Sequence, residues 1–154
     1  MKKLLLILAG GLLNLSLIAQ DYKGANSRSV EDKLNEEYCT GLFQSAHGTI
    51  LDVQSSPSAN AYINILDWLE GRVAGLQVYK SRTGTSVPVI RGQVPGIYID
   101  EVPVSAYFLS ALNVNDIAII KVIKTPFFGG ANSSNGAIAI YTLGDEEDEE
   151  DSGK

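Results

Sequence analysis

The spacing of apolar residues predicts one clear helix in the middle of the chain. Its apolar positions recur every three or four residues, which places them on a single helical face. These positions are Tyr62, Ile65, Leu66, Leu69 and Val73. We expect Ser58 or Asn60 to cap the start of this helix. We expect Gly71 or Gly75 to end it, and Trp68, which lies off the apolar face, to flank that face.

Short runs of β-branched and aromatic residues predict strands on both sides of this helix. The runs occupy residues 49–53, 76–79, 87–90, 97–99, 102–104, 118–124 and 136–142. Pro88 and Pro103 confine their strands to sheet edges or ends, because proline cannot donate a hydrogen bond to a neighbouring strand. The order of elements predicts an α+β (α/β-like) domain, with a small mixed sheet of about four to five strands and two or three short helices.

The first residues have the parts of a secretory signal peptide. Lys2 and Lys3 supply the positive charge that precedes a mostly apolar stretch at residues 4–18. A small residue, Ala19, ends this stretch, and we predict cleavage after it, so that residues 1–19 are removed. The mature chain is then exported to the periplasm or the outer membrane. The alternative is an uncleaved inner-membrane anchor, for which the apolar stretch is short.

The mature chain divides into a leader, a domain and a tail. Residues 20–47 are polar and predict a partly disordered leader, in which residues 30–38 can form a short helical turn. Residues 48–143 contain the predicted helix and strands and form the domain. Residues 144–154 predict an acidic, disordered tail, because seven consecutive acidic residues at 145–151 repel one another.

Composition argues against most catalytic and nucleic-acid-binding functions. The 154 residues include one cysteine, Cys39, and one histidine, His47, which excludes an internal disulfide and His-rich or multi-cysteine metal sites. The formal net charge of −6 belongs to the acidic run; without that run and Lys154, 11 basic and 11 acidic residues remain. The body therefore lacks the basic excess that nucleic acid requires. We predict no enzyme and no catalytic, cofactor-binding or metal-binding residues, with Cys39 buried and His47 exposed.

Five segments, in this order, resemble the plug domain of TonB-dependent outer-membrane receptors, in the form found in Bacteroidota. The segments are residues 65–78, 89–92, 97–104, 115–124 and 129–142. The first contains Gly-Arg-Val-Ala-Gly at 71–75, where glycine permits the turn from helix to strand. The family usually has glycine after the position of Asp100, whereas this chain has Glu101. A two-residue turn favours Asp-Gly, so we expect a longer turn or another type here.

The resemblance implies a binding or interaction module at the outer membrane. A full receptor encloses its plug in a barrel of 22 strands, which needs more than roughly 200 residues in strands. We therefore expect no transport by this chain alone. The implied partner is an outer-membrane or cell-surface protein, with a β-barrel as one candidate, and no small molecule is identified. The alternatives are a soluble periplasmic protein that binds a metal chelate or a glycan, and a truncated receptor remnant.

Five residues form the interaction face that we predict. Arg72, Arg91 and Lys121 match basic positions of the family, where such side chains can face the barrel wall. The alternative is that Arg72 caps the helix and the other two are surface or strand-edge charges. Phe127 and Phe128, beside glycines, are the candidates for an exposed hydrophobic contact.

Overall fold

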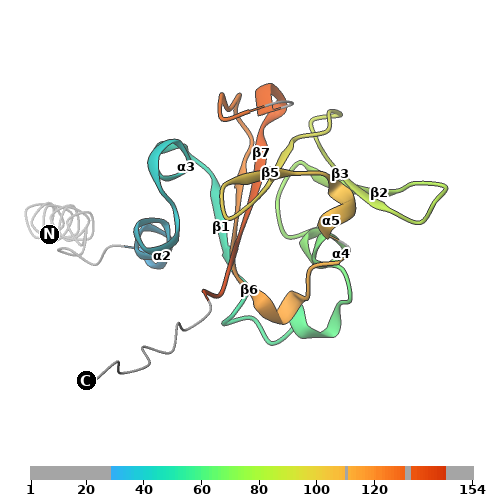
Figure 1. Ribbon diagram of the computed structural model, residues 1–154, viewed down its shortest axis with the longest axis horizontal. Helices are drawn as coiled ribbons and strands as arrows, with labels where there is room; N and C mark the ends of the chain where they lie inside the picture. Colours follow the sequence, from blue (N-terminus) through green and yellow to red (C-terminus); the bar gives the residue numbers. More distant parts are fainter. Residues whose placement is uncertain (1–28, 110, 131–132, 145–154) are drawn as a thin grey trace, which may run out of the picture.

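The computed structural model describes residues 29–109, 111–130 and 133–144. The predicted signal peptide and the acidic run at 145–151 lie outside these residues. In Figure 1 a five-stranded sheet crosses the middle of the molecule and has helices on either side. Within the described ranges, no helix has the length and apolar character that a membrane crossing requires.

The described part of the chain contains short helices and seven strands. The helices are α2 (Val30–Tyr38), α3 (Gly41–Ser45), α4 (Ile65–Leu69) and α5 (Ala106–Leu109), with 3-10 turns η2 (Ala59–Ala61), η3 (Val114–Asp116) and η4 (Ser133–Asn135). The strands are β1 (Thr49–Asp52), β2 (Leu76–Lys80), β3 (Ser86–Ile90), β4 (Gly96–Ile99), β5 (Val102–Val104), β6 (Ile117–Ile123) and β7 (Ala137–Thr142).

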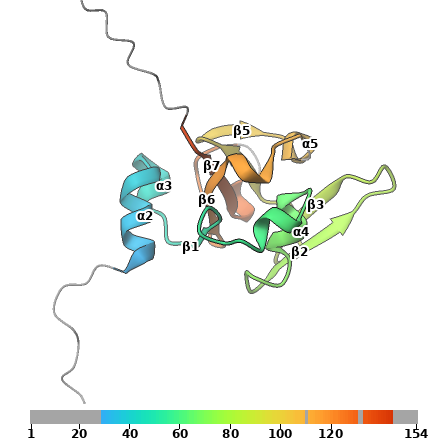
Figure 2. The same ribbon diagram turned by 90° about the horizontal axis from the view of Figure 1, so that it is seen from below.

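The main sheet is mixed, as the sequence predicts. Its strand order is β1-β6-β7-β4-β5, in which β4 and β7 run parallel and the other pairs are antiparallel. Strands β2 and β3 form a separate antiparallel hairpin, which projects from the body in both views (Figures 1 and 2). Pro103 lies in the edge strand β5 and Pro88 in the hairpin, so neither proline interrupts a central strand.

Alternate residues of the central strands point to two separate apolar cores. In β6, Ile120 and Val122 join the core that α4 and the β2–β3 hairpin cover. Ile119 and Ile123 join the second core, which lies on the opposite face beneath α2 and α3 (Figure 2). Both faces are therefore covered, which explains why β6 is buried along its whole length.

The helix predicted from the apolar spacing is shorter than that spacing suggests. Helix α4 ends at Leu69, and the chain then turns at Gly71 with a φ of +78°. Asn64 caps the start of α4, where its side-chain oxygen accepts from the Leu66 amide at 2.9 Å. The expected caps, Ser58 and Asn60, do not have this role. Trp68 is only 2% exposed, so it belongs to the core and does not merely flank it.

The structure also differs from the expected leader. Residues 29–47 are the part of the expected leader that the structure describes. They form two helices that pack on the sheet. Helix α2 begins with a capping box in which Ser29 and Asp32 each accept from the other's backbone amide. Cys39, which lies between the two helices, is buried at 2% exposure, as predicted, and His47 is exposed.

Gly136, immediately before β7, packs closely against the end of β6. Its φ is +102°, and an added Cβ would collide with the Ile123 carbonyl oxygen. We expect Gly136→Ala to lower the free energy of unfolding by at least about 2 kcal/mol, measured by urea denaturation. The control is Gly144→Ala, because nothing lies within 4 Å of an added Cβ there. Equal stability of the two variants would contradict this packing.

Candidate interaction sites

A tight turn after β3 presents Arg91 to solvent. The Ile90 amide donates to the Gln93 carbonyl at 2.8 Å, and the Gln93 amide donates back at 3.0 Å. Between them, Arg91 and Gly92 have φ values of +53° and +80°, as a type I′ turn requires. Glycine suits such a φ, whereas arginine is strained in it, and residues held in this way cluster at functional positions.

Lys124 lies beside this turn and makes the site cationic. A small cavity of about 150 Å³ separates the β3 turn from the loop after β6. Its lining residues are Ile90, Arg91, Gln93, Lys124, Pro126, Ser134 and Asn135. The Lys124 ammonium also donates to the Ala74 carbonyl at 3.2 Å. Two cationic side chains and no carboxylate therefore line the described wall of this cavity, which suits an anionic group of a partner.

Arg72 caps the end of α4, which is the alternative to its expected place in the interaction face. Its guanidinium donates to the Trp68 carbonyl, one of the last carbonyls of α4. It also lies over the Trp68 ring, with its central carbon 4.5 Å from the ring centroid, and 5.7 Å from that of Tyr62. These contacts stabilise the end of α4 and hold the side chain against its own helix.

The two phenylalanines of the predicted face have opposite environments. Phe127 is buried, and its ring centroid lies 4.7 Å from that of Phe43 and 6.0 Å from that of Tyr98. The expectation of an exposed contact is wrong for Phe127, because Phe43 of α3 covers it. Phe128 is 87% exposed and follows Lys124 and Pro126 in the same loop.

Lys121 is neither a surface charge nor part of an exposed face. It lies in the central strand β6 and is 2% exposed. Its ammonium donates to the side-chain oxygen of Asn35 at 2.6 Å, and to the carbonyls of Phe43 and Gln44. Burial lowers the pKa of Lys121 below the ordinary value of 10.5. This lysine therefore binds α2 and α3 to the sheet.

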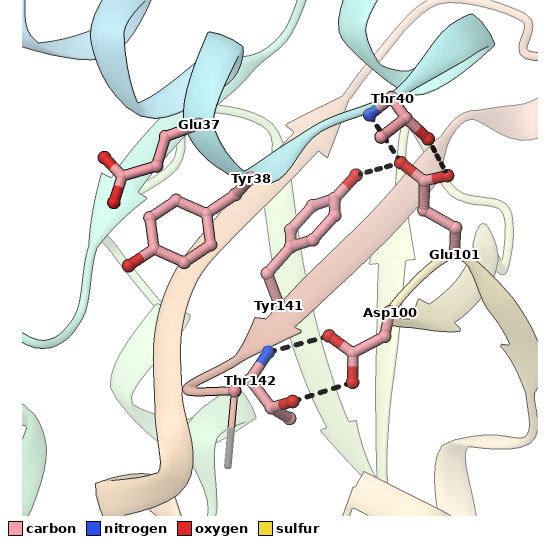
Figure 3. A pocket seen from close by; sticks show the side chains of 8 residues that line it. Glu37, Tyr38, Thr40, Asp100, Glu101, Tyr141 and Thr142 are labelled. Carbon is pink, nitrogen blue, oxygen red and sulfur yellow. Dashed lines mark hydrogen bonds between the residues drawn. The ribbon is translucent and has the colours of Figure 1, made fainter. Parts of the chain in front are cut away.

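Figure 3 shows a second polar junction, at the turn between β4 and β5. Asp100 and Glu101 have φ values of +47° and +65°, so the turn has two residues despite the missing glycine. The expectation of a longer or different turn is wrong. The Glu101 carboxylate accepts from the Thr40 amide at 2.7 Å, from the Thr40 hydroxyl at 2.5 Å, and from the Tyr141 hydroxyl at 3.2 Å.

The polar groups beside Glu101 are stabilised in their neutral forms. Burial raises the pKa of the Cys39 thiol above its ordinary value of 9.0, although Tyr141 and Lys121 oppose this shift. Burial also raises the pKa of the Tyr141 hydroxyl, and the neighbouring Cys39 and Glu101 add to the effect. Asp100 accepts from the amide and the hydroxyl of Thr142 at 2.9 and 2.8 Å. These residues thus form a hydrogen-bonded cluster that joins the turn to β7 and to Thr40. Neither the Cys39 thiol nor the Tyr141 hydroxyl is activated as a nucleophile.

A family model described as the TonB-dependent receptor plug domain matches residues 50–137. No curated protein matches the chain. The matched range includes Arg91, Lys124 and the turn at Glu101, but it begins after α2 and α3.

Solved structures of a peptide importer and of a ferric enterobactin receptor share the fold. A structure of the RagAB peptide importer in its closed-closed state is 25% identical, with a TM-score of 0.53 over 64% of this chain. A mutant of the ferric enterobactin receptor PfeA from Pseudomonas aeruginosa is 17% identical, with a TM-score of 0.52 over 71% of this chain. These matches cover 12% and 18% of the two larger chains, so this chain spans only a small part of either protein.

The contacts of Tyr141 predict the response of stability to alkaline pH. A raised pKa in the folded state contributes stability that is present below the ordinary pKa and is lost as pH rises above it. The free energy of unfolding should therefore fall above pH 9 for Cys39 and above pH 10 for Tyr141. In Tyr141→Phe the slope above pH 10 should be shallower by up to about 1.4 kcal/mol per pH unit.

Urea denaturation from pH 8 to pH 11 measures this difference. Lys121 and Tyr38 also have shifted pKa values, but both remain in wild type and variant, so their effects cancel in the comparison. The same comparison in a Cys39→Ser background removes the thiol, whose pKa depends on its hydrogen bond with Tyr141. Identical slopes for the two proteins would show that Tyr141 is not held neutral by its surroundings.

Proposed function

We propose that this chain, which belongs to the TonB-dependent receptor plug domain family, is an exported interaction module that docks on an outer-membrane β-barrel. The family match supports the choice of partner, because plug domains belong to such receptors. The sequence of residues 1–19 supports export. In this account the module binds a partner and carries out no catalysis.

The cationic cavity is the observation that carries the proposal. Arg91 and Lys124 lie in the matched family range and border one cavity, and neither has a carboxylate partner among the described residues that line it. A partner that supplies carboxylates would form charge-assisted hydrogen bonds with both side chains, and arginine can hold a carboxylate through two parallel bonds. We therefore infer that acidic side chains of the barrel wall occupy this cavity.

Phe128 adds an apolar contact to the same surface. It is 87% exposed, and it lies in the loop that also supplies Lys124 and Pro126 to the cavity. A large aromatic side chain next to paired cations is typical of the centre of a protein interface, where aromatic residues and arginine contribute most to binding. The predicted face is thereby revised: Arg91, Lys124 and Phe128 form it, whereas Lys121, Phe127 and Arg72 make contacts within the domain.

Site-specific photo-crosslinking tests this docking face. A photoreactive phenylalanine analogue in place of Phe128 keeps an aromatic ring at a position that is already exposed. In cells of the source bacterium we expect it to crosslink to an outer-membrane β-barrel protein, identified by mass spectrometry. In the double variant Arg91→Gln and Lys124→Gln, the crosslink yield should fall at least about tenfold, because two charge-assisted contacts are lost.

The matched control is the double variant Lys33→Gln and Arg82→Gln. It removes the same charge from α2 and from the tip of the hairpin, and it should leave the crosslink yield unchanged. Equal losses of crosslink yield in both double variants would mean that the yield depends on net charge and not on Arg91 and Lys124. Crosslinks that form only with soluble periplasmic proteins would contradict the proposed partner.

A further inference from the structure

Residues 29–48 form a separate layer on the plug fold, which we name the N-terminal strap. The strap contains α2, α3 and the link to β1, and it precedes the range that matches the family. It covers the face of the main sheet that carries Ala118, Ala137 and Ala139 (Figure 2). The strap contributes no strand to this sheet.

Few apolar side chains attach the strap to the sheet. Helix α2 has no fully buried residue, although its Leu34 and Tyr38 are partly buried against the second core, and α3 buries only Phe43. Cys39, between the helices, is the other buried apolar residue of the strap. The opposite face of the sheet buries Ile65, Leu66 and Leu69 from α4 alone. Because hydrophobic stabilisation scales with buried apolar area, the strap is held less strongly than the rest of the domain.

Polar anchors contribute much of the attachment, and the first is Lys121. An ammonium has three N–H donors, and the strap supplies three acceptors, the side-chain oxygen of Asn35 and the carbonyls of Phe43 and Gln44. The amide of Asn35 also donates to the Gln44 carbonyl at 2.9 Å, which ties α2 to α3. The two helices consequently share one anchor and one internal link.

The second anchor is Glu101, and it is strained. A type I′ turn favours glycine at its second central position, whereas Glu101 has a φ of +65° there. Its carboxylate accepts both the amide and the hydroxyl of Thr40, which lies between α2 and α3 (Figure 3). Glutamate thus provides an attachment for the strap that glycine at this position would lack.

We propose that the N-terminal strap is a releasable cover, which detaches as a unit from Lys121 and Glu101 while both central strands stay folded. Rotation occurs at residues 46–48, where the chain passes from α3 to β1. Release uncovers Cys39 and an apolar sheet face with one ammonium at its centre. The proposal is independent of docking through Arg91 and Lys124, since neither residue contacts the strap in the hydrogen bonds and cavities described.

The single native cysteine reports strap release directly. Cys39 is 2% exposed, so a thiol reagent reacts with it only after the strap opens. Its labelling rate in the full chain is compared with that of Ala59→Cys in a Cys39→Ser background, because Ala59 is fully buried in the opposite core. Each rate is divided by the labelling rate of the same cysteine in the unfolded chain. We then expect Cys39 to react at least about tenfold faster than position 59, and its rate to depend little on low concentrations of urea.

Variants of the Glu101 anchor separate release from general destabilisation. Thr40→Val and Glu101→Gln should each raise the Cys39 rate several-fold, and the rate at position 59 should not change. Glu101→Gly should also raise the Cys39 rate without a lower urea midpoint, because glycine relaxes the turn. The control is Thr125→Val, an exposed threonine beyond β6, which should alter neither rate.

Equal labelling rates at Cys39 and position 59 would overturn the proposal, since the strap would then open only when the whole domain unfolds. Parallel increases at both positions in the Thr40 and Glu101 variants would overturn it as well. Neither result affects the crosslinking at Phe128, so failure of the strap proposal and failure of the docking proposal are distinguishable.

Discussion

The attachment of the N-terminal strap to the sheet depends on a buried charge in the central strand. Lys121 is 2% exposed, and an ammonium removed from water needs an acceptor for each of its N–H groups. No strand of the sheet can supply these oxygens, because sheet carbonyls are directed along the plane of the sheet. Residues 35, 43 and 44 supply them from outside the matched plug range. One lysine thus makes the N-terminal helices part of the domain.

The sheet could be predicted from sequence because its signals are local. Alternation and β-rich runs place all seven strands, and the two prolines mark peripheral positions correctly. Apolar spacing predicts too long a helix at α4, because the spacing continues past Gly71, where the backbone has already turned. The attachment of the two strap helices could not be predicted in this way. The apolar stripe of α2 is narrow, with only Leu34 and Tyr38 partly buried, and the helix is also held by a lysine 86 residues further along the chain.

The interaction face was only partly predictable for a similar reason. Lys121 and Lys124 are three positions apart, and sequence resemblance does not show which of them is buried. The alternation of β6 decides the matter, because it turns Lys121 toward α3 and the strand ends before Lys124. Glu101 was expected to lengthen its turn, but contacts with Thr40 and Tyr141 hold it in a two-residue turn. Both outcomes depend on contacts between segments far apart in sequence.

Hydrogen–deuterium exchange of the full chain and its Lys121→Met variant tests most directly whether this lysine joins the strap to the sheet. Methionine fills the same space without a charge, so β6 and β7 retain their packing while three strap oxygens lose their donor. We predict that amides of residues 30–46 exchange faster in the variant, and that amides of β6 and β7 keep their protection. Unchanged exchange in residues 30–46, or an equal loss of protection throughout the domain, would contradict it.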